Sequence, residues 1–407
     1  MQTGIRTIAS SLLASIFALL CLLPGLLLLK FDGETRSLTE NRELAGLPGR
    51  PGSLDEAAAW SGKFDAFVAD HFGKREKLVA AYNYLHVIAG VSPIERALVG
   101  RAGWLFLEQT RLKDTNRGAL PLGQQTLDSL LGSFELRQAY LDSKNTAFIV
   151  MPVPDKNSMF PEYLPASVKF VGPSRLDQFR EGMAQANFNS VDVVPRLQSA
   201  KAAGEEIYFQ TDSHWNSRGA WFGYLALMDG IREAGYPGGT LLAESDVEFI
   251  RLDPYQPTDI VKNLLGLSGW VSEDHGIRAR VHQPGEIRAF RASDGKEYDY
   301  LYGPPPGQEQ KHFKRSTPRD GSRVLIYRDS YANAMLPFLV HSFDELIYAR
   351  APKNMSFDPA DIERHQPDLV IYEFVERALF YAPDDSLLKA AMENDRTAGR
   401  GDRSFEN

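Results

Sequence analysis

Val324-Leu325-Ile326-Tyr327-Arg328-Asp329-Ser330-Tyr331 is the stretch from which the fold of this chain can best be predicted. Its first four residues are an apolar run suited to a buried strand, and a polar turn and a plausible helix follow. A serine that ends a buried strand and opens a helix is exposed on a sharp turn, which is where hydrolases and acyltransferases hold a nucleophile. Ser330 is therefore a candidate nucleophile. Alternatively, its hydroxyl only caps the helix that follows, which is a very common role for serine.

A second stretch, Gln210-Thr211-Asp212-Ser213-His214-Trp215-Asn216, carries a carboxylate and an imidazole two residues apart. In a Ser-His-Asp site the carboxylate fixes the tautomer of the imidazole and stabilises its cation, while the imidazole takes the proton of the serine. Asp212 and His214 are therefore candidates for the orienting carboxylate and the general base. An Asp-x-His triplet alone is weak evidence, because Asp212 could cap the following helix and His214 could pack on Trp215.

Strands and helices alternate with short connections over much of the chain. This order favours a parallel sheet covered by helices on both faces, so the predicted fold class is α/β. The loop after the first of these strands carries Asp155, Lys156 and Asn157, and loops in this position are where α/β proteins bind ligands. The expected strands are 146–151, 191–194, 324–327, 346–348 and 369–372, and the expected helices are 127–140, 217–234 and 359–365.

Residues 241–318 break this pattern, because Asp, Pro and Gly become frequent and short segments alternate polar and apolar residues. We expect an irregular insertion there with some strands, including 277–281 and 287–290. The insertion would lie within one catalytic domain at 53–395. A charged, flexible tail is expected at 396–407.

Residues 8–29 are almost continuously apolar, which is long enough for a helix to cross ~30 Å of hydrocarbon. A cleaved signal peptide is the alternative, but its apolar region is normally shorter and a small-residue cleavage site should follow it. We expect an uncleaved transmembrane anchor with a cytoplasmic tail at 1–7 and a polar linker at 30–52. The body of the chain would then lie outside the cytoplasmic membrane.

Charge and cysteine content exclude several classes of protein. The formal net charge of −8 argues against general nucleic-acid binding. Cys21 is the only cysteine in the 407 residues, so an internal disulfide and a cysteine-based zinc or iron–sulfur site are excluded. We expect neither a cofactor nor a metal ion.

Taken together, the two stretches resemble a known family. Asp212-x-His214-Trp215, followed far along the chain by Asp329-Ser330-Tyr331, resembles the SGNH-hydrolase-like O-acetyltransferases of bacterial exopolysaccharide export, in particular the membrane-anchored alginate O-acetyltransferase type. Ordinary SGNH esterases carry the serine first, so the order here is that of a circular permutation. Further similar pieces are Glu40-Asn41-Arg42, Asp70-His71-Phe72, 100–107 and Pro367-Asp368-Leu369-Val370-Ile371-Tyr372-Glu373.

The resemblance implies an SGNH-like catalytic domain in the periplasm, anchored in the inner membrane. Ser330 would take up an acetyl group, His214 would act as general base, and Asp212 would orient His214. The acetyl group would pass to hydroxyls of an exopolysaccharide. A membrane-bound acyltransferase would supply it, and a polysaccharide export complex would be a further partner.

Some roles and the outcome of the reaction stay open at this point. Arg328 stands where the family often has glycine, and this cation could help bind an anionic sugar or could narrow the oxyanion site. Backbone N–H groups near Ser330 should stabilise the oxyanion, with Asn157 or Asn333 as side-chain candidates. If water attacks the acetyl-serine, the chain is a carbohydrate acetylesterase. If the three residues are vestigial, it is a non-catalytic subunit of a polysaccharide complex.

Overall fold

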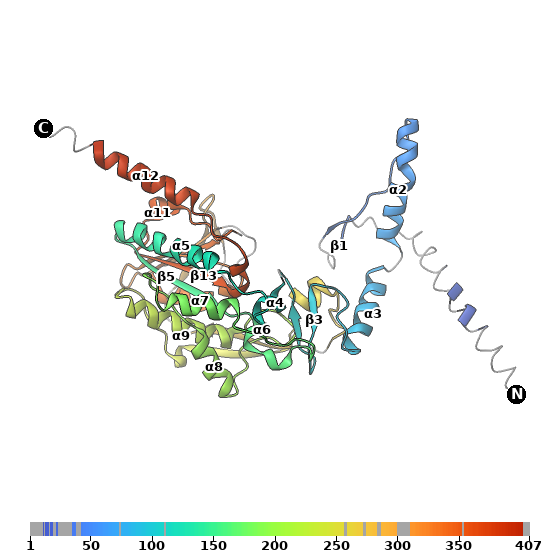
Figure 1. Cartoon of the computed structure of the whole chain (residues 1–407), viewed down its shortest axis with the longest axis horizontal. Helices are drawn as coiled ribbons and strands as arrows, with labels where there is room; N and C mark the ends of the chain where they lie inside the picture. Colours follow the sequence, from blue (N-terminus) through green and yellow to red (C-terminus); the bar gives the residue numbers. More distant parts are fainter. Residues whose placement is uncertain are drawn as a thin grey trace. The chain divides into compact units, whose positions relative to one another are not determined.

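The computed structural model divides the chain into two compact units, which are described separately here (Figure 1). The first comprises Met1–Val99 and Gln256–Glu273, and the second comprises Gly100–Tyr255 and Asp274–Asn407. The domain expected at 53–395 thus has parts in both units. The residues that the structure describes are 11, 13–15, 17–18, 22, 35–37, 42–72, 75–109, 111–255, 259–271, 274–282, 286–298, 310–351 and 354–401.

Most of the anchor expected at 8–29 lies outside the described residues. Within the part of the chain that is described, no helix is long and apolar enough to cross a membrane. The anchor therefore stays an expectation from the sequence. The linker expected at 30–52 contains a short antiparallel pair, β1 (Arg36–Ser37) and β2 (Arg42–Glu43).

Two helices, α2 (Leu54–His71) and α3 (Arg75–Ile88), make up much of the described part of the first unit. The Ser53 side chain caps α2 by accepting a hydrogen bond from the Glu56 N–H at 3.2 Å. In α3, Asn83 Nδ2 donates to Leu265 O at 2.8 Å and so holds the segment that follows the π-helical turn η3 (Asp259–Leu264). The unit also contains the strand β3 (Ala97–Val99).

A seven-stranded sheet forms the centre of the second unit, in the order β5-β13-β11-β12-β10-β8-β9. The first four strands are parallel, which confirms the predicted parallel sheet for these strands, and β10, β8 and β9 extend it as an antiparallel edge. Every residue of β13 is buried, as is typical of a parallel strand covered on both faces. The strands are β5 (Ala147–Val153), β8 (Ile287–Arg291), β9 (Glu297–Tyr298), β10 (Lys311–Arg315), β11 (Arg323–Arg328), β12 (Glu345–Arg350) and β13 (Leu369–Val375).

Helices cover both faces of this sheet because successive strand residues point to opposite sides. From β5, Phe148 and Val150 enter a core cluster with side chains of α5 and α7, and Figure 1 shows α5 beside β5 and β13. On the other side, Met151 lies against α9. The longer helices are α5 (Gln124–Ser143), α7 (Arg175–Met183), α8 (Val194–Ala202), α9 (Ser217–Glu233), α10 (Leu336–Ser342), α11 (Pro359–His365) and α12 (Ser386–Gly401), so α12 continues into the tail expected from 396 on.

Two glycines let α9 approach the segment that precedes it. A Cβ atom added to Gly219 would lie 2.1 Å from Ile207 O, and one added to Gly223 would lie 2.7 Å from the ring of Trp215. Neither distance is possible for a real Cβ atom, so α9 needs glycine at both positions to pack where it does.

In its described residues, the segment expected to be an irregular insertion forms the strands β6 to β10. The antiparallel pair β6 (Val247–Tyr255) and β7 (Asp274–Val281) forms a separate two-stranded sheet. The strands expected at 277–281 and 287–290 are confirmed, since they lie within β7 and β8. Together with β9 and β10, β8 forms the antiparallel edge of the main sheet.

The carboxyl ends of β5, β13 and β11 lie at one edge of the sheet, because these three strands are neighbours and parallel. The chain leaves the sheet there at Asp155, Glu376 and Asp329. This edge, expected from the sequence to carry the functional residues, holds the site described next.

Candidate active site

Ser330 lies in the turn between β11 and the 3-10 helix η4 (Tyr331–Ala334). The apolar residues of β11 are buried, whereas Ser330 is exposed. Its backbone has a helical conformation (φ −72°, ψ −19°), and its side chain makes no capping hydrogen bond to η4. The alternative role of Ser330 as a helix cap is therefore not supported.

His214 lies in a loop at 207–216 that folds back on itself. Tyr208 and Trp215 form an isolated antiparallel bridge, and the Phe209 N–H donates to His214 O at 3.2 Å. The loop is therefore not a strand of the main sheet. The strand expected at 191–194 is wrong, because this stretch follows an isolated bridge between Val150 and Ser190 and α8 begins at Val194.

Asn216, and not Asp212, caps the helix that follows the loop. Asn216 Oδ1 accepts hydrogen bonds from the N–H groups of Arg218 and Gly219, at 2.9 and 3.0 Å. The alternative reading of Asp212 as a helix cap is thus wrong, and its carboxylate contacts His214 instead.

The side chains of Ser330, His214 and Asp212 form a continuous chain of hydrogen bonds. His214 Nε2 lies 2.7 Å from Ser330 Oγ, and His214 Nδ1 lies 2.7 Å from Asp212 Oδ1. Asp212 is 4% exposed and the His214 side chain 25% exposed, so the carboxylate is shielded while the serine end faces solvent. With the Nδ1 proton on the Asp212 side, Nε2 can accept the Ser330 proton. The predicted contacts are confirmed, and the catalytic roles remain predictions.

A reciprocal pair of hydrogen bonds fixes the two stretches against each other. Trp215 Nε1–H donates to Tyr331 O at 2.8 Å, and Tyr331 Oη–H donates to Ser213 O at 2.7 Å. Ser213 and Trp215 flank His214, and Tyr331 follows Ser330. Both hydrogen bonds therefore hold the backbone beside His214 against the backbone beside Ser330. Burial, and next the charge of Asp155, raises the pKa of Tyr331 well above its usual range, which keeps its hydroxyl a donor.

Lys156 holds the first half of the loop from α6 (Lys156–Met159). Its ammonium group donates to three backbone carbonyls, those of Phe209 at 3.1 Å, Gln210 at 3.0 Å and Asp212 at 2.5 Å. Lys156 is only 1% exposed. Three carbonyl acceptors match the three donors of an ammonium group and offset the cost of its burial.

Asp274 holds the same loop from the start of β7. Its Oδ2 accepts hydrogen bonds from the Thr211 N–H at 2.6 Å and from Thr211 Oγ1 at 3.0 Å. Both residues are buried. The residue directly before Asp212 is therefore fixed through its backbone and its side chain.

Asp329 anchors the serine turn to β13. Its carboxylate accepts from the Tyr331 N–H at 2.8 Å and from the Val375 N–H at 2.7 Å, and its own N–H donates to Glu373 Oε2 at 3.0 Å. Burial, and next the charge of Asp329, raises the pKa of Glu373 well above its usual range. The backbone on both sides of Ser330 is thus held by contacts that end on β13, the neighbour of β11.

Asp155 and Glu376 tie the loop after β5 to the 3-10 helix η5 (Glu376–Phe380). Asp155 pairs with the guanidinium group of Arg377 and accepts from the Arg377 N–H at 3.0 Å. Its own N–H donates to Glu376 Oε2 at 3.0 Å, and Asn116 of α4 (Leu112–Asn116) donates to Glu376 Oε1 at 2.6 Å. Burial, and next the charge of Asp155, raises the pKa of Glu376 to about 8.

The three further candidates are all held by structural contacts. Asn157 is buried and its Nδ2 donates to Leu107 O, in β4 (Leu105–Leu107), at 3.4 Å. Arg328 is 5% exposed, with its guanidinium carbon 4.4 Å from the centre of the Tyr348 ring. Asn333 Oδ1 accepts from Tyr348 Oη at 3.0 Å. Their predicted substrate and oxyanion roles remain predictions.

Sequence reasoning missed the residues that position the site. Lys156 was recognised only as part of a possible ligand loop, and Asp274 lies in the segment expected to be irregular. For Tyr331 and Trp215 a signal was present, because each is an aromatic residue with a polar tip directly beside a candidate catalytic residue.

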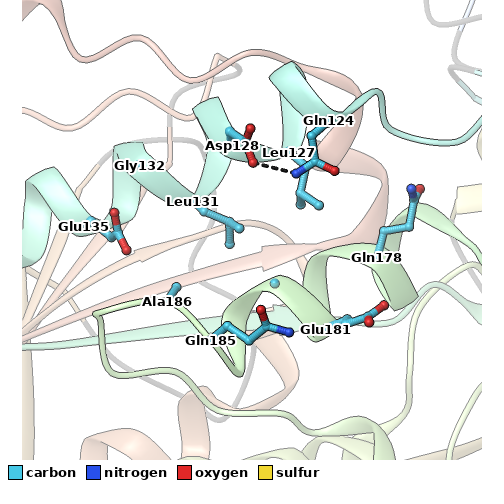
Figure 2. A pocket seen from close by; sticks show the side chains of 11 residues that line it. Gln124, Leu127, Asp128, Leu131, Gly132, Glu135, Gln178, Glu181, Gln185 and Ala186 are labelled. Carbon is cyan, nitrogen blue, oxygen red and sulfur yellow. Dashed lines mark hydrogen bonds between the residues drawn. The ribbon is translucent and has the colours of Figure 1, made fainter.

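A groove of about 540 Å³ lies between α5 and α7, away from the residues just described (Figure 2). Figure 2 shows Leu127 and Leu131 on one wall and Gln178 and Glu181 on the other, with Gln124 donating to Asp128 at 2.7 Å. None of the candidate residues lines this groove. The site at Ser330 is therefore defined by its side-chain geometry and not by this hollow.

Comparison with known proteins supports the fold and identifies a family. Residues 97–297 match the model of the SGNH hydrolase-like domain of the acetyltransferase AlgX, a range that contains Asp212 and His214 and ends before Ser330. Over 138 residues the chain is 30% identical to the probable alginate O-acetylase AlgJ of Pseudomonas putida. This match spans 33% of the chain and 33% of that relative.

Solved structures with a similar fold are distant in sequence. PatB1 of Bacillus cereus covers 71% of this chain and 97% of its own, with 15% identity and a TM-score of 0.51, which supports the fold alone. The O-acetyltransferase domain of Pseudomonas putida AlgJ covers 74% of this chain and 99% of its own, with 18% identity and a TM-score of 0.47, too low to support an argument. The match at residues 97–297 shows that the chain carries an SGNH hydrolase-like acetyltransferase domain of the AlgX type. The chain is thus a distant homologue of the AlgJ and AlgX alginate O-acetylases.

Proposed function

We propose that this chain is a polysaccharide O-acetyltransferase that carries the acetyl group on Ser330. The observation that supports this most is the hydrogen-bonded chain from Ser330 through His214 to Asp212, with both distances 2.7 Å. It occurs in a chain of the alginate and exopolysaccharide O-acetyltransferase family. The geometry supplies a nucleophile, a base and an orienting carboxylate in the order that acyl transfer requires.

In the first step, Ser330 Oγ attacks the carbonyl carbon of an acetyl donor while its proton passes to His214 Nε2. The buried carboxylate of Asp212 stabilises the imidazolium that forms. When the tetrahedral intermediate collapses, the bond to the leaving group of the donor breaks and His214 returns the proton to that group. The result is an acetyl ester on Ser330 and a neutral His214.

In the second step, a sugar hydroxyl attacks the acetyl-serine and its proton passes to His214 Nε2. Collapse releases the acetylated sugar, and Ser330 Oγ takes the proton back. If water attacks in place of the sugar, acetate is released and the chain acts as an esterase. Because Ser330 is exposed, either acceptor can reach the acetyl group, and binding of the sugar must decide between them.

The negative charge on the carbonyl oxygen needs donors close to Ser330. The N–H groups of Tyr331 and Asn333 are already bound, to the Asp329 carboxylate and to Ser330 O. We therefore assign the first oxyanion donor to the Ser330 N–H. The side chain of Asn333 or Asn157 is the second, and the buried charge of Arg328 adds a positive potential at the same turn.

The location of the site follows from the anchor expected at 8–29. With the body of the chain in the periplasm, cytoplasmic acetyl-CoA cannot reach Ser330. A membrane-bound acyltransferase then has to pass the acetyl group across the inner membrane, and a polysaccharide export complex supplies the acceptor. A reporter fused after residue 40 should be active only when it is exported, and activity of a cytoplasmic reporter there would contradict this location.

Turnover of an activated phenyl acetate by the full chain tests the chemistry. Ser330→Ala should lower kcat by on the order of 10⁴-fold or more while the thermal unfolding temperature stays unchanged. Ser199→Ala, at an exposed serine of α8, is the control and should have no effect. Equal turnover by wild type and Ser330→Ala would show that the assigned site is wrong.

Adding an oligosaccharide acceptor separates the remaining alternatives. A transferase gives acetylated sugar, and the release of free acetate falls in proportion. An esterase releases acetate at the same rate with every acceptor. A non-catalytic subunit shows no turnover that depends on Ser330, His214 or Asp212.

A further inference from the structure

We infer that one face of α3 lies on the surface of the lipid bilayer and gives the first unit a second membrane contact besides the expected anchor. The face consists of Leu78, Tyr82, Leu85 and Ile88, and we call it the α3 stripe. This inference uses the location proposed above, but it goes beyond the acetyl transfer proposed for Ser330. It concerns only the first unit.

The α3 stripe leaves large apolar side chains exposed to solvent. The exposed fractions are 44% for Leu78, 55% for Tyr82, 61% for Leu85 and 62% for Ile88. Leu78, Tyr82 and Leu85 follow one another at intervals of four and three residues, so they line one face of the helix. A helix of a soluble protein normally turns such a face to the core. An exposed apolar stripe of this kind marks an interaction surface.

The other face of α3 already has its partner within the first unit. Ala80 and Asn83 are buried, and Asn83 Nδ2 donates to Leu265 O at 2.8 Å. The centre of the Tyr84 ring lies 5.6 Å from the centre of the Trp270 ring. The helix is therefore fixed by one face, and the exposed α3 stripe is available to a further partner.

A short connection to the expected anchor keeps α3 close to the bilayer. Ser37 Oγ donates to Glu76 Oε1, in the first turn of α3, at 3.0 Å. Ser37 lies eight residues after Leu29, the last residue of the expected anchor. Because a fully extended chain of this length spans at most about 30 Å, Ser37 cannot lie farther than that from the end of the anchor. The bilayer is therefore within reach of the helix that Ser37 contacts.

The residues around the α3 stripe fit a lipid surface better than a second protein chain. Residues 77–94 contain no Asp or Glu, so no carboxylate of this segment is repelled by an anionic headgroup layer. Trp270 is 43% exposed, and tryptophan and tyrosine are enriched where a membrane meets water. Helices that pair with a second copy usually carry acidic and basic side chains beside the apolar stripe. The occupant that this surface favours is therefore the bilayer.

The connection to the anchor lets a small apolar face bind the bilayer. The α3 stripe alone would give weak, reversible binding, since stable membrane attachment normally takes two signals. The expected anchor supplies the first signal and keeps α3 at a high local concentration of lipid. The α3 stripe would then limit how far the first unit moves from the membrane.

Fluorescence quenching of the full chain in lipid nanodiscs tests the inference. Cys21→Ser removes the only cysteine, so that Ile88→Cys can carry a single nitrobenzoxadiazole fluorophore. Phospholipids with a nitroxide just below the headgroup should lower the fluorescence by about 2-fold or more, because an interfacial helix is buried about 5–10 Å into this layer. Leu78→Ser and Leu85→Ser together should abolish most of this quenching.

Matched controls separate the α3 stripe from exposed apolar residues in general. The same fluorophore at Leu387→Cys, a position of α12 that is 56% exposed, should show no quenching. In the chain labelled at residue 88, Leu387→Ser should leave the quenching unchanged. Turnover of the phenyl ester should be unchanged in the Leu78→Ser/Leu85→Ser variant, so failure of the inference and failure of the proposed function are separate outcomes.

Three results would overturn the inference. The first is no quenching at residue 88 in a chain that copurifies with nanodiscs. The second is quenching that is equally strong in the Leu78→Ser/Leu85→Ser variant or at residue 387. The third is shielding of the fluorophore that depends on the number of chains per nanodisc and not on the nitroxide, which would assign the α3 stripe to a second copy. A chain that does not enter nanodiscs would refute the expected anchor and the inference together.

Discussion

Ser330 and His214 share one hydrogen bond, but the protein holds the two residues by different means. The turn at Ser330 follows a central parallel strand, and Asp329 joins it to the backbone of the neighbouring strand. The loop at 207–216 has an isolated bridge of its own and a backbone hydrogen bond from the Leu105 N–H of β4 to Gln210 O, and the side chains of Lys156, Asp274 and Tyr331 supply further contacts. The nucleophile is thus positioned by the sheet and the base mainly by side chains. Substitutions remote from the reaction should therefore disturb His214 more than Ser330.

Removing the base gives the largest expected effect and tests whether the two regions act together. His214→Ala should lower kcat for a phenyl acetate by about 10⁴-fold or more, because serine is a poor nucleophile at neutral pH without its base. Asp212→Ala should be less damaging, since the imidazole keeps some basicity. His282→Ala, at a half-exposed histidine paired with Glu248, is the control and should leave turnover unchanged. Wild-type turnover in His214→Ala would end the catalytic interpretation of both regions.

Removing Lys156, which donates to carbonyls of the loop at 207–216, sharpens the comparison. Lys156→Met removes the ammonium donor from the carbonyls of Phe209, Gln210 and Asp212, of which Gln210 O keeps the Leu105 N–H at 3.1 Å, and should lower the free energy of unfolding by about 3–5 kcal/mol. The matched control is Lys201→Met, since Lys201 is 28% exposed, donates to one backbone carbonyl, that of Met159, and pairs with the half-exposed carboxylate of Glu162 at 2.7 Å. It should cost less than about 1 kcal/mol. Urea unfolding measures both values, and similar losses in the two variants would show that the loop does not depend on Lys156.

The pH dependence of stability tests the contacts of Glu376, which lies directly after β13 on the side of the site that the sheet positions. The folded-state pKa of Glu376 is raised from 4.5 to about 8, so the folded protein holds a proton that the unfolded chain has released over this range. Stability should therefore fall as pH rises from about 4.5 to about 8, by at most ~1.4 kcal/mol per pH unit from this group. Glu376→Gln resembles the protonated acid and lacks this loss.

Urea unfolding at pH 5.5 and at pH 8 measures the effect. Relative to wild type, Glu376→Gln should be more stable at pH 8 than at pH 5.5, by about 3 kcal/mol. Glu181→Gln, at an exposed position of α7, should show no such change. A difference between Glu376→Gln and wild type that is the same at both pH values would contradict the raised pKa.

The smallest effect is expected when the Tyr331 hydroxyl, which joins the turn at Ser330 to the loop at 207–216, is removed. Tyr331→Phe removes the hydrogen bond to Ser213 O at 2.7 Å and a longer one to Asp155 Oδ1 at 3.5 Å, so it should cost about 1 kcal/mol of stability and lower kcat by up to about 10-fold, with KM unchanged. Tyr372→Phe removes a comparable bond to Ser356 O in the core and should cost similar stability without a change in kcat. If both variants lose the same activity, Tyr331 has no positioning role beyond stability.

The main sheet could be predicted from the sequence because its parallel strands are continuous apolar runs. β11, β12 and β13 were expected at nearly their observed positions, since a strand buried on both faces leaves no room for polar alternation. The stretch at 191–194 is also largely apolar and was wrongly expected to be a strand. It follows an isolated bridge beside β5 and α8 begins at Val194, and a short apolar run does not reveal whether it pairs with a sheet.

The catalytic candidates were predicted from residue types and from the resemblance. The residues that hold the candidates in position were not predicted. Asp212, His214 and Ser330 are recognisable because their chemistry is specific. Lys156 and Asp274 act on backbone groups of the loop, and any residue at 209–212 offers the same carbonyls and N–H groups. Such contacts depend on tertiary structure alone and leave no mark in the sequence of the loop.

The glycines of α9 limit how this protein can be stabilised by design. Replacing a glycine inside a helix by alanine usually gains about 1 kcal/mol, because alanine has the higher helix propensity. At Gly219 and Gly223 the added methyl group would meet Ile207 O at 2.1 Å and the Trp215 ring at 2.7 Å. Either replacement would push α9 away from the loop that carries His214. A thermostability screen should therefore recover gains at exposed helix positions and lose activity at these two.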